Sequence, residues 1–292
     1  MRHSKVHKAP VDFPRSGLGA WLLAADGEAF CKRFATANKL YWRLPVSLSW
    51  DTGSGLYTVT DHDHETYTQD SVTSRIAIAR RERVFRYRRG VDDRIRRLAK
   101  KYFVDRMTLN NGDVVVDCGA NVGEIGLFAK AQADVRLIAI EPSTREAGAC
   151  DANLFGGSQD THRIALWHSE GTQTFYDSNA TGDSSLIAPA QAHTSASTVR
   201  TTTLTKLSSE LGVERIKLLK IEGEGAEPEI LAGANDIMPN VDYCTVDCGP
   251  ERGANQDHVI PQVCNNLIGA GFELLDVNLE RQIFWFRNRS IV

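Results

Sequence analysis

The chain contains 292 residues, of which 42% are hydrophobic and 24% charged, and its formal net charge is −3. This composition is ordinary for a folded globular protein, and the nearly balanced charge excludes a general binder of polyanions. No apolar run approaches the roughly 18–20 residues that a membrane-crossing helix needs, so the sequence predicts no transmembrane helix.

The N-terminus and the cysteines bear on the compartment. Residues 1–10 are basic, but no apolar segment follows them, so we expect no signal peptide. The six cysteines are scattered, with no C-x-x-C pair and no zinc-binding spacing. Reduced thiols of this kind indicate a cytoplasmic protein.

Residues 1–106 are expected to form an N-terminal arm and cap. Up to about Ala25 the sequence has no periodic pattern and predicts a loose arm. Asp26 is a favourable N-cap for a helix that continues to Ala37.

Two short strands, 56–60 and 66–68, are predicted on either side of a polar turn at 61–65. The turn alternates His with Asp and Glu, all of which can bind metals. Successive side chains of an extended segment point in opposite directions. A solvated turn is therefore the preferred interpretation, and a metal site is the alternative.

Residues 75–106 carry thirteen Lys and Arg residues against four acids, a local net charge of +9. Apolar residues recur between them, which predicts a helix, a break at Gly90 and a second helix. The preferred interpretation is a pair of amphipathic helices with a basic outer face. The alternative is a basic rim that attracts an anionic substrate, such as a nucleotide-linked or lipid-linked sugar. Nucleic acid is a weaker alternative, because no recognised binding motif accompanies the charge.

From residue 107 to residue 292, short apolar runs alternate regularly with helical segments, which predicts an α/β fold with a mostly parallel sheet. The last two runs indicate an antiparallel hairpin that closes the sheet. A polar insertion near 170–198 interrupts the alternation, and its hydroxyl-rich centre at 182–186 predicts a mobile segment. The predicted strands are 114–117, 137–141, 162–166, 199–204, 216–222, 241–247, 272–277 and 282–286, and the predicted helices are 124–132, 145–154, 207–211, a segment through Ile230, and 257–269.

The stretch 114–124 carries the clearest functional signal. Three valines lead into Asp117 and then into a turn with Gly119 and Gly123, after which a helix begins. A buried strand, a glycine turn and a helix N-terminus in this order form the first half of a nucleotide-type cofactor site. A dinucleotide site requires a second glycine where this chain has Asn121, so a NAD-linked oxidoreductase is disfavoured.

The spacing D-x-G-x-x-x-G, from Asp117 to Gly123, resembles motif I of class I S-adenosylmethionine (SAM) methyltransferases. SAM has an amino-acid tail, a sulfonium, a ribose diol and an adenine, but no phosphate. Asp117 at the end of its strand suits the ammonium of the tail, and the glycines leave room for the tail. Glu141 ends the next strand, where a carboxylate can accept hydrogen bonds from both ribose hydroxyls.

Six motifs, at 90–94, 102–103, 112–124, 140–142, 184–186 and 219–227, together resemble the FkbM family of SAM-dependent methyltransferases. The resemblance extends from about residue 88 to the C-terminus. The chain departs from the family pattern at Glu222, where the family has Asp, and at Gly223, where it has an apolar residue.

The resemblance implies a Rossmann-like class I methyltransferase sheet and methylation of a hydroxyl group on a sugar, a glycan or a polyketide-type product. It implies SAM as the cofactor and a small-molecule or glycan acceptor, nucleotide-linked or lipid-linked. A homo-oligomer is compatible with it, and nucleic acid is not favoured as a partner. The residues expected to hold SAM are Asp117, Gly119, Asn121, Gly123, Glu124, Glu141, Pro142 and Ala165.

The acceptor is expected beside the strand that ends at Glu222. Methyl transfer mainly requires positioning of the acceptor oxygen, and a general base adds about 10²–10⁴-fold. Glu222 is the predicted base or acceptor clamp, and Lys220 points the same way along the strand. Glu224 is predicted to orient the acceptor or to cap the next helix, and His193, in the insertion, is the rival base. A magnesium ion between Glu222 and Asp247 is a further alternative, because oxygen ligands suit it.

Other functions remain open. A methyltransferase acting on nucleic-acid bases usually carries an Asn/Asp-Pro-Pro-Tyr segment after its fourth strand, whereas this chain has Glu222-Gly223-Glu224 there. A protein acceptor is a further alternative. A non-catalytic SAM-binding or scaffold protein would share the fold and bind SAM, but it would not turn over.

Overall fold

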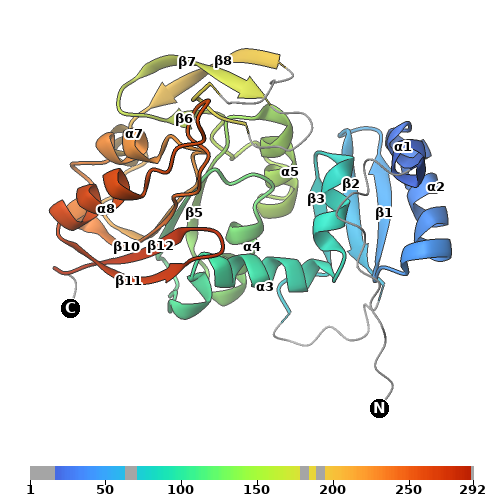
Figure 1. Cartoon of the computed structure of the whole chain (residues 1–292). Coiled ribbons are helices and arrows are strands. Elements are labelled where there is room, and N and C mark those ends of the chain that lie inside the picture. The colour runs from blue at the N-terminus through green and yellow to red at the C-terminus, as the bar shows by residue number, and fades with distance from the viewer. Residues whose placement is uncertain (1–16, 63–70, 178–183, 189–194, 291–292) are drawn as a thin grey trace. The chain divides into compact units, whose positions relative to one another are not determined.

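The computed structural model describes residues 17–62, 71–177, 184–188 and 195–290 (Figure 1). The chain divides into two compact units, Met1–Arg94 and Ile95–Val292. Helix α3 (Val91–Lys101) contains the boundary between them. In the described ranges, no helix combines the length and the apolar character that crossing a membrane requires.

The first unit contains a three-stranded antiparallel sheet in the order β1-β2-β3, and α2 packs on β1. Its elements are α1 (Gly17–Leu23), α2 (Gly27–Ala37), the π-helix η2 (Asn38–Trp42), β1 (Val46–Asp51), β2 (Leu56–Asp61), β3 (Arg75–Ile78) and the 3₁₀ helix η4 (Arg81–Tyr87). The predicted helix after Asp26 is confirmed, and the Asp26 carboxylate accepts the N–H of Gly27 at 2.9 Å. The predicted loose arm is wrong for α1, because Leu22 is fully buried and fixes that helix in the core.

The prediction of two helices within 75–106 is only partly correct. The first part is a strand, β3, and a 3₁₀ helix, and only α3 after Gly90 is an α-helix. The residues of β3 alternate in burial with the period of a strand and pair with β2, and this pairing outweighs their helical propensity. Arg80 and Arg83 are buried, so the basic residues of this stretch do not all lie on an outer face.

The polar turn after β2 begins with a residue that has a structural role. Oδ1 of Asp61 accepts the N–H of Val91 at 2.7 Å and so satisfies a free donor at the start of α3. Residues 63–65 of that turn and the predicted strand 66–68 lie outside the described residues.

The second unit is built on a six-stranded sheet. Its elements are β4 (Val114–Cys118), α4 (Glu124–Gln132), β5 (Arg136–Ile140), α5 (Thr144–Leu154), β6 (Ala165–Leu166), β7 (Gly171–Asp177), β8 (Ser195–Thr202), α6 (Leu204–Glu210), β9 (Ile216–Ile221), α7 (Glu227–Ala232), β10 (Val241–Asp247), α8 (Ile260–Gly269), β11 (Phe272–Asn278) and β12 (Ile283–Asn288), with the 3₁₀ turns η5 (Val104–Arg106) and η6 (Met238–Asn240). The sheet order is β11-β12-β10-β9-β4-β5, with β10, β9, β4 and β5 parallel and β12 and β11 antiparallel. This confirms the predicted α/β class, the mostly parallel sheet and the closing hairpin.

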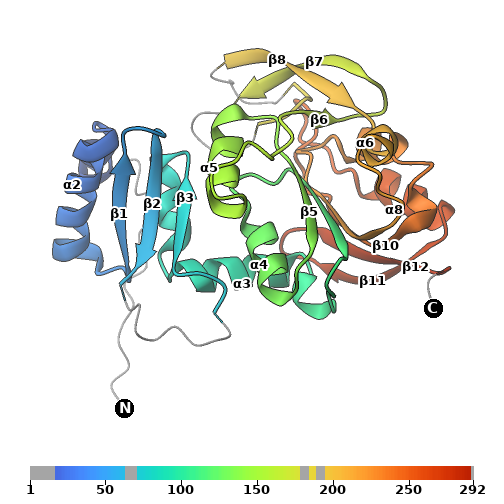
Figure 2. The ribbon, with the colours of Figure 1, turned by 180° about the vertical axis from the view of Figure 1, so that it is seen from behind.

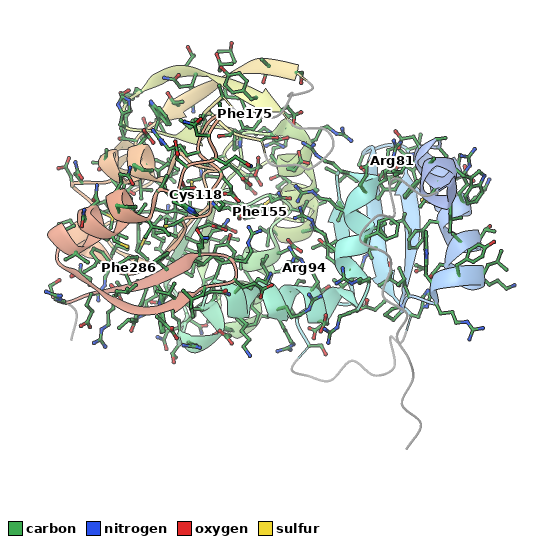
Figure 3. The ribbon with its side chains drawn as sticks, viewed as in Figure 1. Arg81, Arg94, Cys118, Phe155, Phe175 and Phe286 are labelled. Atoms are coloured by element: carbon green, nitrogen blue, oxygen red, sulfur yellow. The ribbon has the colours of Figure 1, made fainter. Side chains whose placement is uncertain are left out.

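Helices cover both faces of this sheet. α4 and α5 lie on one side of it, and α7 and α8 lie on the other (Figures 1 and 2). Parallel strands covered in this way are buried on both faces and read as continuous apolar runs, as the fully buried Val115 and Val116 show. Cys118, at the end of the same run, lies in the interior of the unit (Figure 3). All six cysteines are free thiols.

The polar insertion contains more regular structure than predicted. β7 and β8 form an antiparallel hairpin, and β8 also pairs with β6. The strand predicted at 162–166 is shorter in the structure. His162 forms an isolated bridge to Ile140, and only Ala165–Leu166, which pair with β8, form a strand. Gly182, Asp183 and His193 lie outside the described residues.

Candidate active site

The sheet order places a topological switch between β4 and β9. From β4 the chain passes to β5 on one side, and it later returns to β9 on the other. Ligands of open α/β sheets bind beyond the carboxyl ends of the strands at such a point. Those ends are Cys118 and Ile221, so the site is expected next to Gly119 and Glu222.

Residues 119–123, called the glycine corner below, bring parts of the chain unusually close together. Gly119 has a φ of 75°, and a Cβ there would lie 2.2 Å from the carbonyl oxygen of Glu222. Gly123 has a φ of 86°, and a Cβ there would lie 2.7 Å from the side chain of Leu154. The glycines were predicted to leave room for a ligand. In the structure these positions need glycine because the end of β9 and the side chains of α5 come too close for a Cβ.

The Glu141 carboxylate links the two turns that follow β4 and β5. One oxygen accepts the N–H of Asn121 and the other accepts the N–H of Ser143, both at 2.9 Å. Burial raises the pKa of Glu141 to about 7, although these two hydrogen bonds oppose the rise. The predicted ribose ligand is therefore a carboxyl group that the backbone has already oriented.

Lys220 is a buried ammonium group surrounded by oxygen atoms. Only 2% of its side chain is exposed. Its Nζ lies 3.1 Å from the carbonyl oxygen of Cys118 and 2.7 Å from that of Gly119. The carboxylates of Asp117 and Glu222 lie 3.1 and 3.0 Å from the same nitrogen. Burial alone would lower the pKa of Lys220, but the two carboxylates raise it above its ordinary value, so the group stays charged.

This arrangement gives Asp117 a partner within the protein. The acid was predicted to face the ammonium of a ligand, but the Lys220 ammonium already lies 3.1 Å from it. Lys220, predicted to act in catalysis, is instead placed to hold the glycine corner through two carbonyl groups. A protonated lysine with four oxygen neighbours cannot act as a base.

Glu222 is ionised more readily than an ordinary glutamate. Burial raises its pKa, but the Lys220 ammonium and hydrogen bonds from Lys220 and Tyr102 outweigh burial and lower the pKa to about 2. A general base works best when its pKa lies near the operating pH. Glu222 is therefore suited to accept a hydrogen bond from a ligand and so hold it in place. It is poorly suited to the predicted role of proton acceptor.

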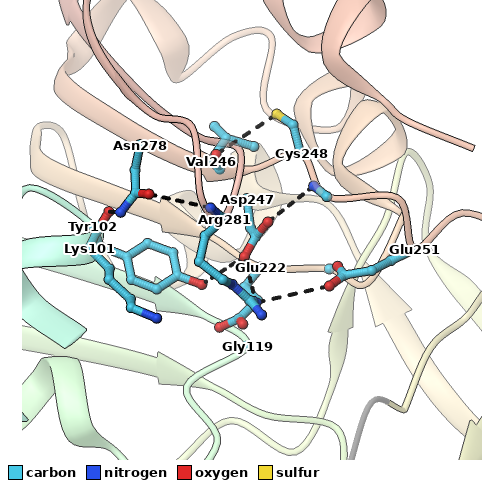
Figure 4. A network of polar contacts seen from close by, with 12 residues as sticks. Lys101, Tyr102, Gly119, Glu222, Val246, Asp247, Cys248, Glu251, Asn278 and Arg281 are labelled. Carbon is cyan, nitrogen blue, oxygen red and sulfur yellow. Dashed lines mark hydrogen bonds and ion pairs between the residues drawn. The ribbon is translucent and has the colours of Figure 1, made fainter. Parts of the chain in front are cut away.

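A cluster of polar side chains continues from Glu222 along the carboxyl ends of β9 and β10 (Figure 4). The hydroxyl of Tyr102, which follows α3, lies 3.3 Å from Oδ2 of Asp247, so its one hydrogen is shared between Glu222 and Asp247. Nη2 of Arg281, from the β11–β12 turn, lies 3.1 Å from Asp247 and 4.0 Å from Glu251. We call these five residues the polar cluster.

Two acids of the polar cluster already have cationic partners within the protein. Glu222 is paired with Lys220, and Asp247 is paired with Arg281. Across the described ranges, no group of three or more His, Cys, Asp or Glu side chains is arranged to hold a metal ion. The structure thus adds no support to a magnesium ion between Glu222 and Asp247.

The loop after β9 is held by α7 and by the insertion. Oε1 of Glu227 accepts the N–H groups of Gly223 at 2.7 Å and Gly225 at 3.3 Å, and burial raises the pKa of Glu227 to about 8. Glu224, with a φ of 51°, accepts a hydrogen bond from Ser185 on its carbonyl oxygen at 2.8 Å. The carboxyl group of Glu224 shares a hydrogen bond with that of Glu251.

The other predicted residues are placed as follows. Glu124 is buried at the start of α4, and Pro142 is half-buried two residues after the end of β5. Ala165 is buried in β6, where it pairs with Thr201 of β8. His193 lies outside the described residues, so its predicted role stays a prediction.

Three residues of the polar cluster had no predicted role: Tyr102, Glu251 and Arg281. Tyr102 was recognised only as part of a motif. Arg281 lies in the turn of the predicted closing hairpin. Because that hairpin is antiparallel, its turn could have been expected near the carboxyl ends of the parallel strands. Glu251 follows a predicted strand end by four positions, a signal that fits many loop residues equally well.

Comparison with known proteins identifies one family model. The methyltransferase FkbM domain matches residues 117–265, which is just over half of the chain. A curated relative, 2-O-methyltransferase NoeI of Sinorhizobium fredii (strain NBRC 101917 / NGR234), is 28% identical over 144 residues. The match covers 43% of this chain and 58% of that protein, so the chain spans less than two thirds of the relative's length.

Among solved structures, a methyltransferase FkbM from Methylobacillus flagellatus KT has a TM-score of 0.43 at 13% identity, and the match covers 72% of this chain and 56% of that one. A precorrin-6y C5,15-methyltransferase from Geobacter metallireducens GS-15 has a TM-score of 0.37 at 10% identity, and the match covers 67% and 87% of the two chains.

Proposed function

Because this chain belongs to the FkbM methyltransferase family, we propose that it transfers the methyl group of SAM to a hydroxyl group of a sugar, a glycan or a similar polyhydroxylated product. SAM-dependent methyl transfer follows from the family. The nature of the acceptor is the proposal. The similarity to a 2-O-methyltransferase supports oxygen as the methylated atom.

The residues at the glycine corner fit SAM by their chemistry. Each oxygen of Glu141 accepts one backbone N–H and keeps a lone pair for a ribose hydroxyl. Gly123 and Glu124 lie at the start of α4, where the free N–H groups of a helix suit the carboxylate of the amino-acid tail. Bound SAM supplies a methyl group already activated by its sulfonium, so the protein mainly has to position the acceptor.

The observation that carries the proposal is the composition of the polar cluster. Its carboxylates accept hydrogen bonds from hydroxyl groups, and its guanidinium donates them to oxygen. Such a mixed set suits an acceptor rich in hydroxyl groups. The cluster and the ion pairs beside it contain four acids, Asp117, Glu222, Asp247 and Glu251, and two cations, Lys220 and Arg281. This excess of negative charge disfavours acceptors that carry phosphate or carboxylate groups near the reacting hydroxyl.

Two measurements test the proposed function. Thermal shift with SAM, S-adenosylhomocysteine (SAH) and NAD should show stabilisation by the first two ligands, and a shift with NAD alone would contradict the assignment of SAM. Release of SAH from SAM is then measured with methyl glycosides of neutral hexoses, amino sugars and uronic acids. We expect turnover with neutral glycosides and O-methylated products. Turnover only with uronic acids would contradict the argument from charge, and release of N-methylated products would contradict a hydroxyl acceptor.

A further inference from the structure

Two loops at the carboxyl ends of the sheet are held together by a glycine and an arginine. Gly225, in the loop after β9, has a φ of 95°, and a Cβ there would lie 2.7 Å from the Cα of Arg252 in the loop after β10. The Arg252 guanidinium donates to the carbonyl oxygen of Gly225 at 2.5 Å, and it pairs with both carboxylate oxygens of Glu229 at 2.6 and 2.8 Å. The neighbours of this contact, Glu224 and Glu251, are thereby brought together.

Glu251 joins the polar cluster from this loop (Figure 4). Its carboxyl group shares a hydrogen bond with that of Glu224, and Oε1 lies 4.0 Å from Nη2 of Arg281. Its own N–H bonds the carbonyl oxygen of Gly249 at 2.9 Å, which fixes the turn. The side chain is 27% exposed, so a ligand can reach it although it contacts Arg281.

The charges that face Glu251 come from both strand ends, from α7 and from the β11–β12 turn. They belong to Glu222, Glu224, Glu227, Asp247 and Arg281. Burial raises the pKa of Glu251 to about 7; Asp247 and Glu222 add to the rise, and Arg281 opposes it. A carboxyl group with such a pKa can both take up and release a proton near neutral pH.

We propose that Glu251 accepts the proton of the acceptor hydroxyl group during methyl transfer, and that Arg281 positions its carboxylate. This inference rests on the proposed function. The acceptor oxygen bonds to the methyl carbon, the methyl–sulfur bond breaks with its electron pair going to sulfur, and the hydroxyl proton moves to Oε of Glu251. One positive charge on sulfur and one negative charge on Glu251 disappear together, so the step is balanced.

The first test is kinetic. Glu251→Gln keeps the size of the side chain but cannot take up the proton, so turnover on the best neutral glycoside should fall by about 10²–10⁴-fold. Affinity for SAH should stay within about twofold, because no contact of Glu251 lies at the glycine corner. In the wild-type protein kcat/KM should rise with pH through the pKa of about 7 and then level off. E251Q should lack this rise, and Glu251→Asp should keep it at a lower rate.

The second test needs no acceptor. In the folded protein Glu251 has a pKa of about 7, against an ordinary value of 4.5. The raised pKa of Glu251 therefore stabilises the folded protein below about pH 4.5, and this contribution is lost as the pH rises to about 7. E251Q does not titrate, so the difference in thermal midpoint between E251Q and wild type should grow across this window and stay constant above it. Glu210→Gln, at an exposed residue of α6, is the matched control and should follow the wild type in midpoint and turnover.

Each outcome is informative. Parallel midpoint curves for E251Q and wild type would overturn the inference, as would full turnover by E251Q with its pH rise retained. Failure of the wild-type chain to bind SAH would contradict the proposed function itself, which separates the two.

Discussion

At the scale of a single residue, Lys220 offers the sharpest stability prediction. Lys220→Met leaves Asp117 and Glu222 without their common cation, and breaking a buried ion pair in this way typically costs about 3–5 kcal/mol. We expect such a loss in the free energy of unfolding, measured by urea denaturation near pH 7. Lys206→Met, at a solvent-accessible ion pair of α6, is the control and should cost under about 1 kcal/mol.

The pH dependence of this loss has a definite sign. Lys220 helps to lower the pKa of Glu222 to about 2, from an ordinary value of 4.5. A lowered pKa contributes stability above the ordinary pKa, and that stability is lost as the pH falls toward the lowered value. The difference between wild type and K220M should therefore shrink below about pH 4.5. An equal difference at neutral and acidic pH would show that the ion pairs do not cause it.

Glu141 gives a prediction about ligand affinity. Glu141→Ala removes the carboxylate proposed to bind the ribose and also frees the N–H groups of Asn121 and Ser143. Hydrogen bonds to charged groups are worth about 1.5–3 kcal/mol, which corresponds to roughly 10- to 100-fold weaker binding of SAH by calorimetry. Glu210→Ala should bind SAH normally. An affinity of E141A within about twofold of wild type would remove Glu141 from the cofactor site.

How far single residues could be predicted depends on whether their position in the chain fixes their environment. Asp117 and Glu141 end apolar runs, so their place at the edge of the sheet followed from the pattern. The environment of Lys220 did not, because its oxygen neighbours come from β4 as well as from Glu222. The pKa of Glu222 likewise depends on Tyr102, 120 positions earlier in the chain, and no local pattern reports such a contact.

At the scale of an element, the turn after β4 can be tested with two glycines. Gly119 and Gly112 both have positive φ, 75° and 85°, but only at Gly119 would a Cβ meet another part of the chain. Gly112→Ala should cost about 1–2 kcal/mol from backbone strain alone and keep SAH binding. Gly119→Ala should cost clearly more and lose SAH binding, because the Cβ forces β4 away from β9. Equal losses in the two variants, measured by denaturation and calorimetry, would contradict this reason for the glycine.

The elements themselves were predictable where the pattern was long and regular. The boundaries of α4 and β10 agree with the prediction, because each is an uninterrupted helical or apolar run between clear turns. β3 was missed because four residues, Arg75–Ile78, are too few to distinguish a strand from a helix by period. β7 was not predicted, and β8 was predicted only from Val199, because the residues of both strands are mostly polar. Pairing between the strands defines them, and hydrophobic alternation does not.

At the scale of the whole molecule, the candidate active site should be separable from the first unit. All described residues assigned to it, including Tyr102, belong to Ile95–Val292. A fragment of residues 90–292, which keeps α3 whole, should bind SAH within about threefold of the full chain. A fragment of residues 107–292 should unfold at lower temperature, because it lacks Tyr102 and the ring of Phe103 that stacks on Trp285 at 5.6 Å.

Calorimetry and thermal unfolding of both fragments against the full chain check this prediction. Loss of SAH binding in the longer fragment would show that the first unit contributes to the site. Equal stability of the two fragments would show that the end of α3 is dispensable.

The hydrogen bonds of Lys220 to the backbone have a consequence for the proposed binding of SAM. Its contacts to Cys118 and Gly119 are made within the protein alone, so the backbone of the binding loop is set during folding. A preorganised loop of this kind loses little conformational entropy when a ligand arrives. The affinity for the ligand then depends on how well the preformed loop matches its shape and charge. SAM and SAH should therefore exchange between turnovers without a change in the backbone of this loop.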